Sequence, residues 1–143
     1  MTPDVDRFYR TLVREAPDAI IYADAQGTIT FWNKAAERIF GFSESEAVGK
    51  SLDIIIPEKL RKRHWDGFAG TIRTGKTRYG AGDVLAVPAL RKDGARISIE
   101  FTILPFPDRT GRILGMAAIL RDVTQRFEEL KRLRKEAASH VLR

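Results

Sequence analysis

The chain has 143 residues, 43% of them hydrophobic, no cysteine and a formal net charge of +6. This length suits one compact domain with a buried core, and the lack of cysteine excludes disulfides, thiolate catalysis and zinc–sulfur sites. No apolar stretch is long enough to span a membrane and the N-terminus lacks a signal-peptide core, so we expect a cytoplasmic protein.

The positive charge lies mainly in two stretches that we expect to be helical, residues 59–63 and 126–143. No nucleic-acid-binding motif accompanies either stretch. A solvated basic helix face accounts for the charge, and we do not expect nucleic acid to be a partner.

The first part of the chain has the turn and capping residues of a β-hairpin followed by short helices. Gly27 is placed to supply the positive φ that a hairpin turn needs. Asn33 is placed to cap a helix, and Ser43 begins a capping box. The expected elements are a helix over 5–15, strands over 19–23 and 28–32, and helices over 34–40 and from 44.

In the second part of the chain, apolar and polar residues alternate as they do in half-buried strands. Pro88 indicates an edge strand or a bulge. The expected elements are a helix from Pro57 to about Thr74, strands over 83–90, 97–103 and 113–120, and a charged helix from 124. This order predicts an α+β fold, with one five-stranded antiparallel sheet and short helices on one face.

The helix after Pro57 places a histidine among hydrophobic residues. The preceding isoleucines, residues 54–56, form an apolar run that we expect to be buried. Pro57 suits a helix start because it lacks an N–H. Four residues then follow at steps of four and lie near one helix face: Leu60, His64, Phe68 and Ile72. An imidazole in this position is either a core group satisfied by hydrogen bonds or a ligand to a cofactor.

Six short motifs follow one another along the chain. They are DAQGTI (24–29), WNKAAE (32–37), FGFS (40–43), VGKS (48–51), RKDG (91–94) and DVT (122–124). In their order and spacing, the chain resembles the PAS sensory family over about residues 10–125. The resemblance implies a PAS fold that senses a ligand and passes its state to an effector, such as a histidine kinase, through terminal helices. It divides the chain into an N-terminal flanking helix (1–15), a PAS domain (16–123) and a C-terminal signalling helix (124–143).

The segment around His64 resembles the haem-binding PAS domains of rhizobial oxygen-sensing kinases and haem-regulated phosphodiesterases. Those proteins carry the proximal histidine seven residues after a proline and eleven before a glycine, and Pro57, His64 and Gly75 have both spacings. The resemblance implies haem b with His64 as the axial metal ligand. The pocket residues that it implies are Ile54, Leu60, Phe68, Ile72, Phe101, Ile103, Ile113 and Met116, with Arg78 or Lys76 pairing with the propionates.

The side of the pocket opposite His64 departs from these oxygen sensors. They carry an arginine or a methionine where this chain has GDVLA (82–86), which contains neither. Dioxygen would be less polarised without that group. Carbon monoxide or nitric oxide is therefore at least as strong an expectation for the signal as oxygen.

A haem-free PAS module is the alternative interpretation, with His64 bonded to a loop. Such a module would act through dimerisation and protein contacts, or would bind flavin or a metabolite. The heptad-like spacing of apolar residues after 123 indicates a helix that packs on the domain or on a second copy, so we expect a homodimer through the terminal helices. We expect no enzymatic activity, because no nucleophile–base pair or phosphate loop is visible.

Overall fold

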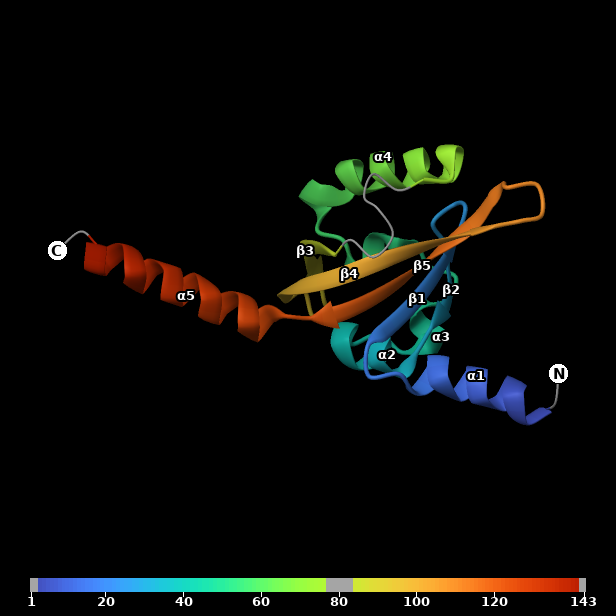
Figure 1. Ribbon diagram of the computed structural model, residues 1–143, viewed down its shortest axis with the longest axis horizontal. Helices are drawn as coiled ribbons and strands as arrows, with labels where there is room; N and C mark the ends of the chain where they lie inside the picture. The colour runs from blue at the N-terminus through green and yellow to red at the C-terminus, as the bar shows by residue number, and fades with distance from the viewer. Residues whose placement is uncertain (1–2, 77–83, 142–143) are drawn as a thin grey trace.

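The computed structural model describes residues 3–76 and 84–141. Within these residues, five strands form one antiparallel sheet in the order β2-β1-β5-β4-β3 (Figure 1). The strands are β1 (Ala19–Asp24), β2 (Ile29–Trp32), β3 (Leu85–Leu90), β4 (Arg96–Pro107) and β5 (Ile113–Asp122). The predicted α+β fold with one five-stranded antiparallel sheet is confirmed.

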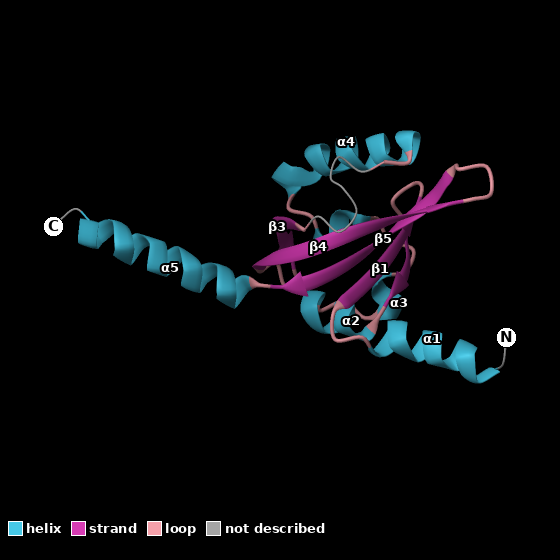
Figure 2. Cartoon of the chain, viewed as in Figure 1, coloured by secondary structure: helices cyan, strands magenta, loops and turns pink. Residues whose placement is uncertain are grey.

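The helices connect β2 to β3 and flank the sheet at both ends of the chain (Figure 2). They are α1 (Pro3–Glu15), α2 (Lys34–Phe40), α3 (Glu44–Ala47), the 3₁₀ helix η1 (Leu52–Ile55), α4 (Glu58–Thr74) and α5 (Thr124–Val141). Helices α1 and α5 extend away from the sheet to opposite sides (Figure 1). None of the helices in the described ranges is long and apolar enough to cross a membrane.

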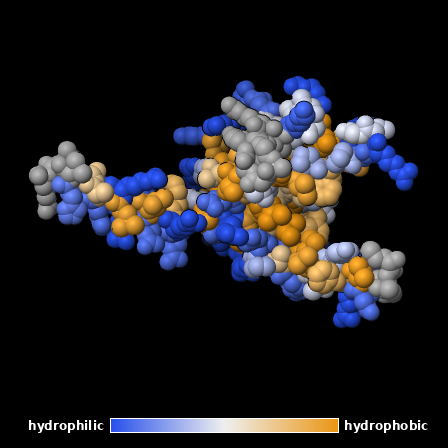
Figure 3. Space-filling view, in the orientation of Figure 1, coloured by the Kyte–Doolittle hydropathy of each residue, from blue (hydrophilic) through white to orange (hydrophobic). Residues whose placement is uncertain are grey.

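Both terminal helices carry exposed hydrophobic side chains. Phe8 and Leu12 of α1, and Phe127 and Leu130 of α5, are each about half exposed or more. Figure 3 shows hydrophobic surface along both helices. The predicted flanking helices are therefore present, and each has an apolar side that is exposed in the described part of the chain.

The strand predicted over 97–103 differs most from its observed extent. It continues to Pro107 because β5 pairs with it as far as that residue, whereas β3 pairs with β4 only as far as Phe101. Among the described residues, only β5 pairs with β4 beyond Phe101, so one edge of β4 is free there and prolines are tolerated. Pro88 lies in the edge strand β3, as predicted. The predicted start of that strand at Asp83 lies outside the described residues.

The expectation that the isoleucine run 54–56 is buried is wrong in part. Only Ile55 is buried, and its two neighbours are half-buried. Ser51 accepts a hydrogen bond from the Asp53 amide at 3.1 Å and starts the 3₁₀ helix η1. A 3₁₀ helix turns by a third of a circle per residue, so consecutive side chains point to different sides. Ile55 therefore lies within the core, whereas Ile54 and Ile56 pack against it and remain partly exposed.

Asn33 joins three elements and confirms the predicted cap of α2. Its Oδ1 accepts from the Ala36 and Ile20 amides, each at 3.0 Å. Its Nδ2 donates to the carbonyls of Val13 and Asp18 at 2.9 and 3.1 Å. Asn33 is buried, and its side-chain amide can be buried because both its oxygen and its nitrogen have hydrogen-bond partners. One side chain thus connects α1, β1 and α2.

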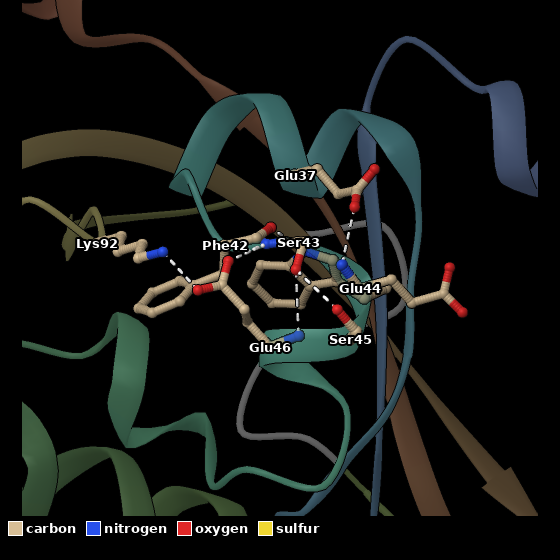
Figure 4. A network of polar contacts seen from close by, with 8 residues as sticks. Glu37, Phe42, Ser43, Glu44, Ser45, Glu46 and Lys92 are labelled. Carbon is tan, nitrogen blue, oxygen red and sulfur yellow. Dashed lines mark hydrogen bonds and ion pairs between the residues drawn. The ribbon is translucent and has the colours of Figure 1, made fainter.

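The predicted capping box also forms, and it reaches a distant hairpin (Figure 4). Ser43 Oγ accepts from the Glu46 amide at 3.2 Å, and Glu46 accepts from the Ser43 amide at 2.9 Å. Glu46 also pairs with Lys92 in the turn between β3 and β4. The hydrogen bond from Lys92, together with that from the Ser43 backbone, lowers the pKa of Glu46 to about 2. Helix α3 is therefore bonded to the hairpin that carries the edge strand.

The buried residues form two clusters that lie on the helix-covered face of the sheet. The larger cluster surrounds Trp32 and Phe40, which are completely or almost completely buried. The smaller cluster contains Phe68 of α4 with Ile113 and Met116 of β5. Helix α4 is thus fixed to the sheet mainly near Phe68, and the space beside that contact is where the site lies.

Candidate functional site

Helix α4 has the boundaries that its flanking residues predict. Pro57 is its N-cap, one position before the first helical residue. Gly75 ends it in the left-handed conformation with a φ of 74°, and its amide donates to the Thr71 carbonyl at 2.8 Å. A residue with a Cβ would be strained at this φ. The two residues that bracket His64 in the sequence therefore define the ends of the helix that carries it.

A cavity of about 1190 Å³ lies between α4 and η1 on one side and the sheet on the other. This exceeds the roughly 300–1,000 Å³ of ordinary small-molecule pockets. Strands β1, β3, β4 and β5 all contribute to its wall. Its apolar lining includes Leu60, Phe68, Leu85, Val87, Ala89, Ile99, Phe101, Ile103, Met116 and Leu120.

The structure brings most of the predicted pocket residues together. The cavity is lined by Leu60, His64, Phe68, Phe101, Ile103 and Met116. The remaining described residues of the predicted set lie elsewhere. Ile54 packs against the larger core cluster. Ile113 belongs to the Phe68 cluster, and Ile72 packs against that cluster. Arg78, predicted to pair with the propionates, lies outside the described residues, and Lys76 is exposed and away from the cavity lining.

His64 is half-buried in the cavity wall, and its ring contacts two other aromatic rings. Its ring centroid lies 4.6 Å from that of Trp65 and 5.9 Å from that of Phe68. The Nδ1 atom is buried and has no hydrogen-bond partner in the described chain. Burial lowers the pKa of His64, and the negative charge of Asp53 opposes this only in part. The imidazole is therefore held in its neutral form, which is the form that binds metals.

Trp65, the neighbour of His64, locks α4 to the elements beside it. Its indole N–H donates to Asp53 Oδ1 of η1 at 2.7 Å. Its ring covers the turn between β1 and β2, where a methyl group added at Gly27 would lie 2.2 Å from ring carbons of Trp65. Arg61 donates to the Ile56 carbonyl at 3.1 Å. These contacts set the position of the helix segment that presents His64 to the cavity.

Sequence reasoning missed two groups of cavity residues. The first is the part of the β3 wall beyond the segment 82–86, where Val87 and Ala89 line the cavity; the alternation along this strand is a signal, but it is short and interrupted by Pro88. The second is a set of charged residues on α4, among them Lys59 and Arg63. The sequence shows these only as part of a basic helix, a pattern that usually means a solvated face.

The cavity wall is bonded directly to the start of α5. Ser98 of β4 accepts from the Val123 amide at 2.9 Å, and its own amide donates to Thr124 Oγ1 at 2.9 Å. Ser98 immediately precedes Ile99, which lines the cavity. Arg121 also pairs with Asp18 at 3.0 Å, which joins the end of β5 to the start of β1. The exit helix is therefore attached to a strand that lines the cavity.

The fold and its cavity define an α+β domain with a large, mainly apolar cavity between α4 and the sheet. The family model described as PAS fold matches residues 7–123. This chain belongs to the PAS family, and it is a signal-sensing domain related to sensor kinases.

Two curated relatives are histidine kinases or sensor proteins. Sensor protein FixL of Bradyrhizobium diazoefficiens is 32% identical over 126 residues, which is 88% of this chain and 24% of FixL. The cell-division control histidine kinase PdhS of Brucella abortus is 29% identical over 131 residues, 90% of this chain and 12% of PdhS. The chain therefore spans a quarter or less of the length of these relatives.

Solved structures agree with the fold. The PAS domain of a Colwellia psychrerythraea protein superposes with a TM-score of 0.74 at 23% identity, covering 85% of this chain and 99% of that chain. The PAS domain of Bordetella pertussis BvgS gives a TM-score of 0.61 at 20% identity, covering 95% and 98%. At these identities the similarity shows the fold alone.

Proposed function

We propose that this chain is the input domain of a signal-transducing protein, and that it senses a gas through a b-type haem held in the α4 cavity by His64. The observation that carries the proposal is a neutral imidazole in the wall of a large, mainly apolar cavity. A neutral imidazole can bind iron through Nε2 while its Nδ1 is held by a backbone or water partner.

The residues around His64 fit this cofactor. The cavity is large and mainly apolar, and aromatic side chains such as Phe68 and Phe101 line it beside the histidine. Haem supplies an iron whose affinity for diatomic gases depends on its axial ligand and on the polarity of the pocket. Val84, Leu85 and Ala86 line the cavity and carry no hydrogen-bonding side chain. This favours carbon monoxide or nitric oxide as signals alongside oxygen.

We propose that the signal reaches the effector through β4 and α5. A ligand that displaces the cavity-facing side chain of Ile99 would move Ser98, and Ser98 holds Val123 and Thr124 at the start of α5. The relatives named as histidine kinases support an effector of that class. In this proposal the domain itself is not an enzyme, and it forms a homodimer through α1 and α5.

A haem titration of the purified chain tests the cofactor. We expect saturable binding with a Soret band for the unchanged protein and for His140→Ala, because His140 is exposed on α5. His64→Ala should lose the band or weaken haem binding by about 100-fold or more, the usual effect of changes at a metal site. Absence of saturable binding in the unchanged protein would overturn the haem proposal and favour a haem-free module.

A further inference from the structure

Helix α4 brings three cations and a single carboxylate to the cavity lining. They are Lys59, Lys62, Arg63 and Asp66. Lys62 is neutralised locally, because its Nζ lies 3.1 Å from Asp66 Oδ2. Lys59 and Arg63 have no carboxylate within ion-pair distance in the described part of the chain. Two positive charges are thus left at the cavity without a counter-charge.

The two cations lie next to the apolar stripe of the same helix. Lys59 and Arg63 are four residues apart, which places them on one side of α4. They immediately precede Leu60 and His64, which line the cavity interior. The side chains of Lys59 and Arg63 are exposed, so their charged ends reach solvent while their stems border the cavity. The site therefore has an apolar interior and a cationic rim.

Other cations of α4 do not share this placement. Arg61 is engaged with backbone carbonyls, including that of Ile56 at 3.1 Å. Arg73 is exposed in the last turn and is not a cavity residue. The free charge at the cavity is therefore a property of Lys59 and Arg63 rather than of the whole basic helix.

We propose that the cavity selects molecules with an apolar body and a carboxylate end, and that Lys59 and Arg63 bind that carboxylate. A guanidinium offers paired donors that match the two oxygens of a carboxylate. Cations at the mouth of a low-dielectric cleft also attract anions before they enter. The inference rests on the proposed function in that the cavity must take a ligand. The carboxylate can belong to a porphyrin or to an aliphatic acid.

Matched acid and ester probes test the carboxylate site. Haem and haem dimethyl ester are titrated by absorbance, and dodecanoate and methyl dodecanoate by calorimetry, with the unchanged protein and with the double variant Lys59→Gln/Arg63→Gln. Arg73→Gln is the control, because it removes the same charge from the same helix outside the cavity. Circular dichroism confirms that each variant is folded.

We expect the double variant to bind the acid form about 10-fold or more weakly and the ester form unchanged. Raising the salt concentration should weaken only acid binding by the unchanged protein. If the double variant binds haem more weakly, the carboxylate belongs to a porphyrin. If it binds dodecanoate more weakly, the carboxylate belongs to an aliphatic acid. Saturable dodecanoate binding without haem binding would overturn the haem proposal and leave this one standing. Equal loss for acid and ester, no loss for either, or binding of none of the four probes would overturn the carboxylate site.

Discussion

His64 combines two properties that a solvated helix residue does not have. Its Nδ1 is buried without a partner in the described chain, and its pKa is lowered by burial. Asp53, whose negative charge opposes this shift only in part, accepts a hydrogen bond from the Trp65 indole. The imidazole therefore remains neutral near pH 7 and is available to an incoming ligand.

The lowered pKa makes the stability of the haem-free protein depend on pH. The folded-state pKa of His64 lies below its unfolded value of about 6.5. As the pH falls below about 6.5, the unfolded chain takes up the proton first, so the free energy of unfolding decreases until the folded pKa is passed. We expect the urea midpoint to be lower at pH 5.5 than at pH 7.5, and His64→Gln to reduce this difference. Glu46 does not interfere, because its stabilising effect is lost only at more acidic pH.

The control for this titration is His140→Gln, which alters an exposed histidine on α5. It should keep the pH dependence of the unchanged protein. If His64→Gln showed the same dependence as the control, burial of a neutral His64 would not be a source of the effect.

At the scale of the elements, the contact between the β1–β2 turn and α4 determines where His64 lies. Gly27 has a φ of 81° and lies under the Trp65 ring. We expect Gly27→Ala to destabilise the fold by about 2–4 kcal/mol, from ~1–2 kcal/mol of backbone strain and a clash with the indole. Urea unfolding measures this loss, and Trp65 fluorescence should change with it.

The variant Gly94→Ala distinguishes the cost of backbone strain from the cost of the clash with the Trp65 indole. Gly94 has a similar φ of 87°, but a methyl group there would meet no atom within 4 Å. We expect a loss of only about 1 kcal/mol for this variant. Equal losses for the two variants would mean that the Trp65 contact contributes nothing beyond the turn conformation.

The sequence predicts elements better than it predicts the site. Capping residues and period-2 alternation are local, so the ends of α2 and α4 and the half-buried strand at Phe101 follow from neighbouring residues. The cavity depends on which elements face one another. Periodicity placed Ile72 on the same helix face as Phe68, and Ile72 does pack against the Phe68 cluster, but it does not line the cavity. In the wall formed by β3, only the segment 82–86 was placed at the pocket, through the family resemblance. Val87 and Ala89 could not be predicted, because their small and aliphatic side chains also suit an ordinary edge strand.

At the scale of the whole molecule, the described residues form three exposed apolar surfaces. They are the exposed sides of α1 and α5 and the outer face of the sheet, where Leu104 and Ile119 are about half exposed (Figure 3). Contiguous exposed apolar surface of this kind is typical of an interface. A second copy of the chain would cover equivalent surfaces on both molecules.

We expect sedimentation to show a concentration-dependent dimer that Phe127→Lys/Leu130→Lys converts to a monomer, because both residues lie on the apolar seam of α5. Gln125→Lys is the matched control, since it adds a positive charge on the opposite side of the helix and should leave the dimer intact. A concentration-independent monomer for the unchanged chain would contradict an interface through the terminal helices.

The claim that His64 is the axial haem ligand is tested most directly by replacing its side chain with free imidazole. His64→Gly should fold, as judged by circular dichroism, but should not show the Soret band of the haem-loaded protein. Added imidazole should then enter the space left by the side chain and restore the band in a saturable manner, which would assign His64 as the axial ligand. A His64→Gly protein with an unchanged Soret band before imidazole is added would contradict this assignment.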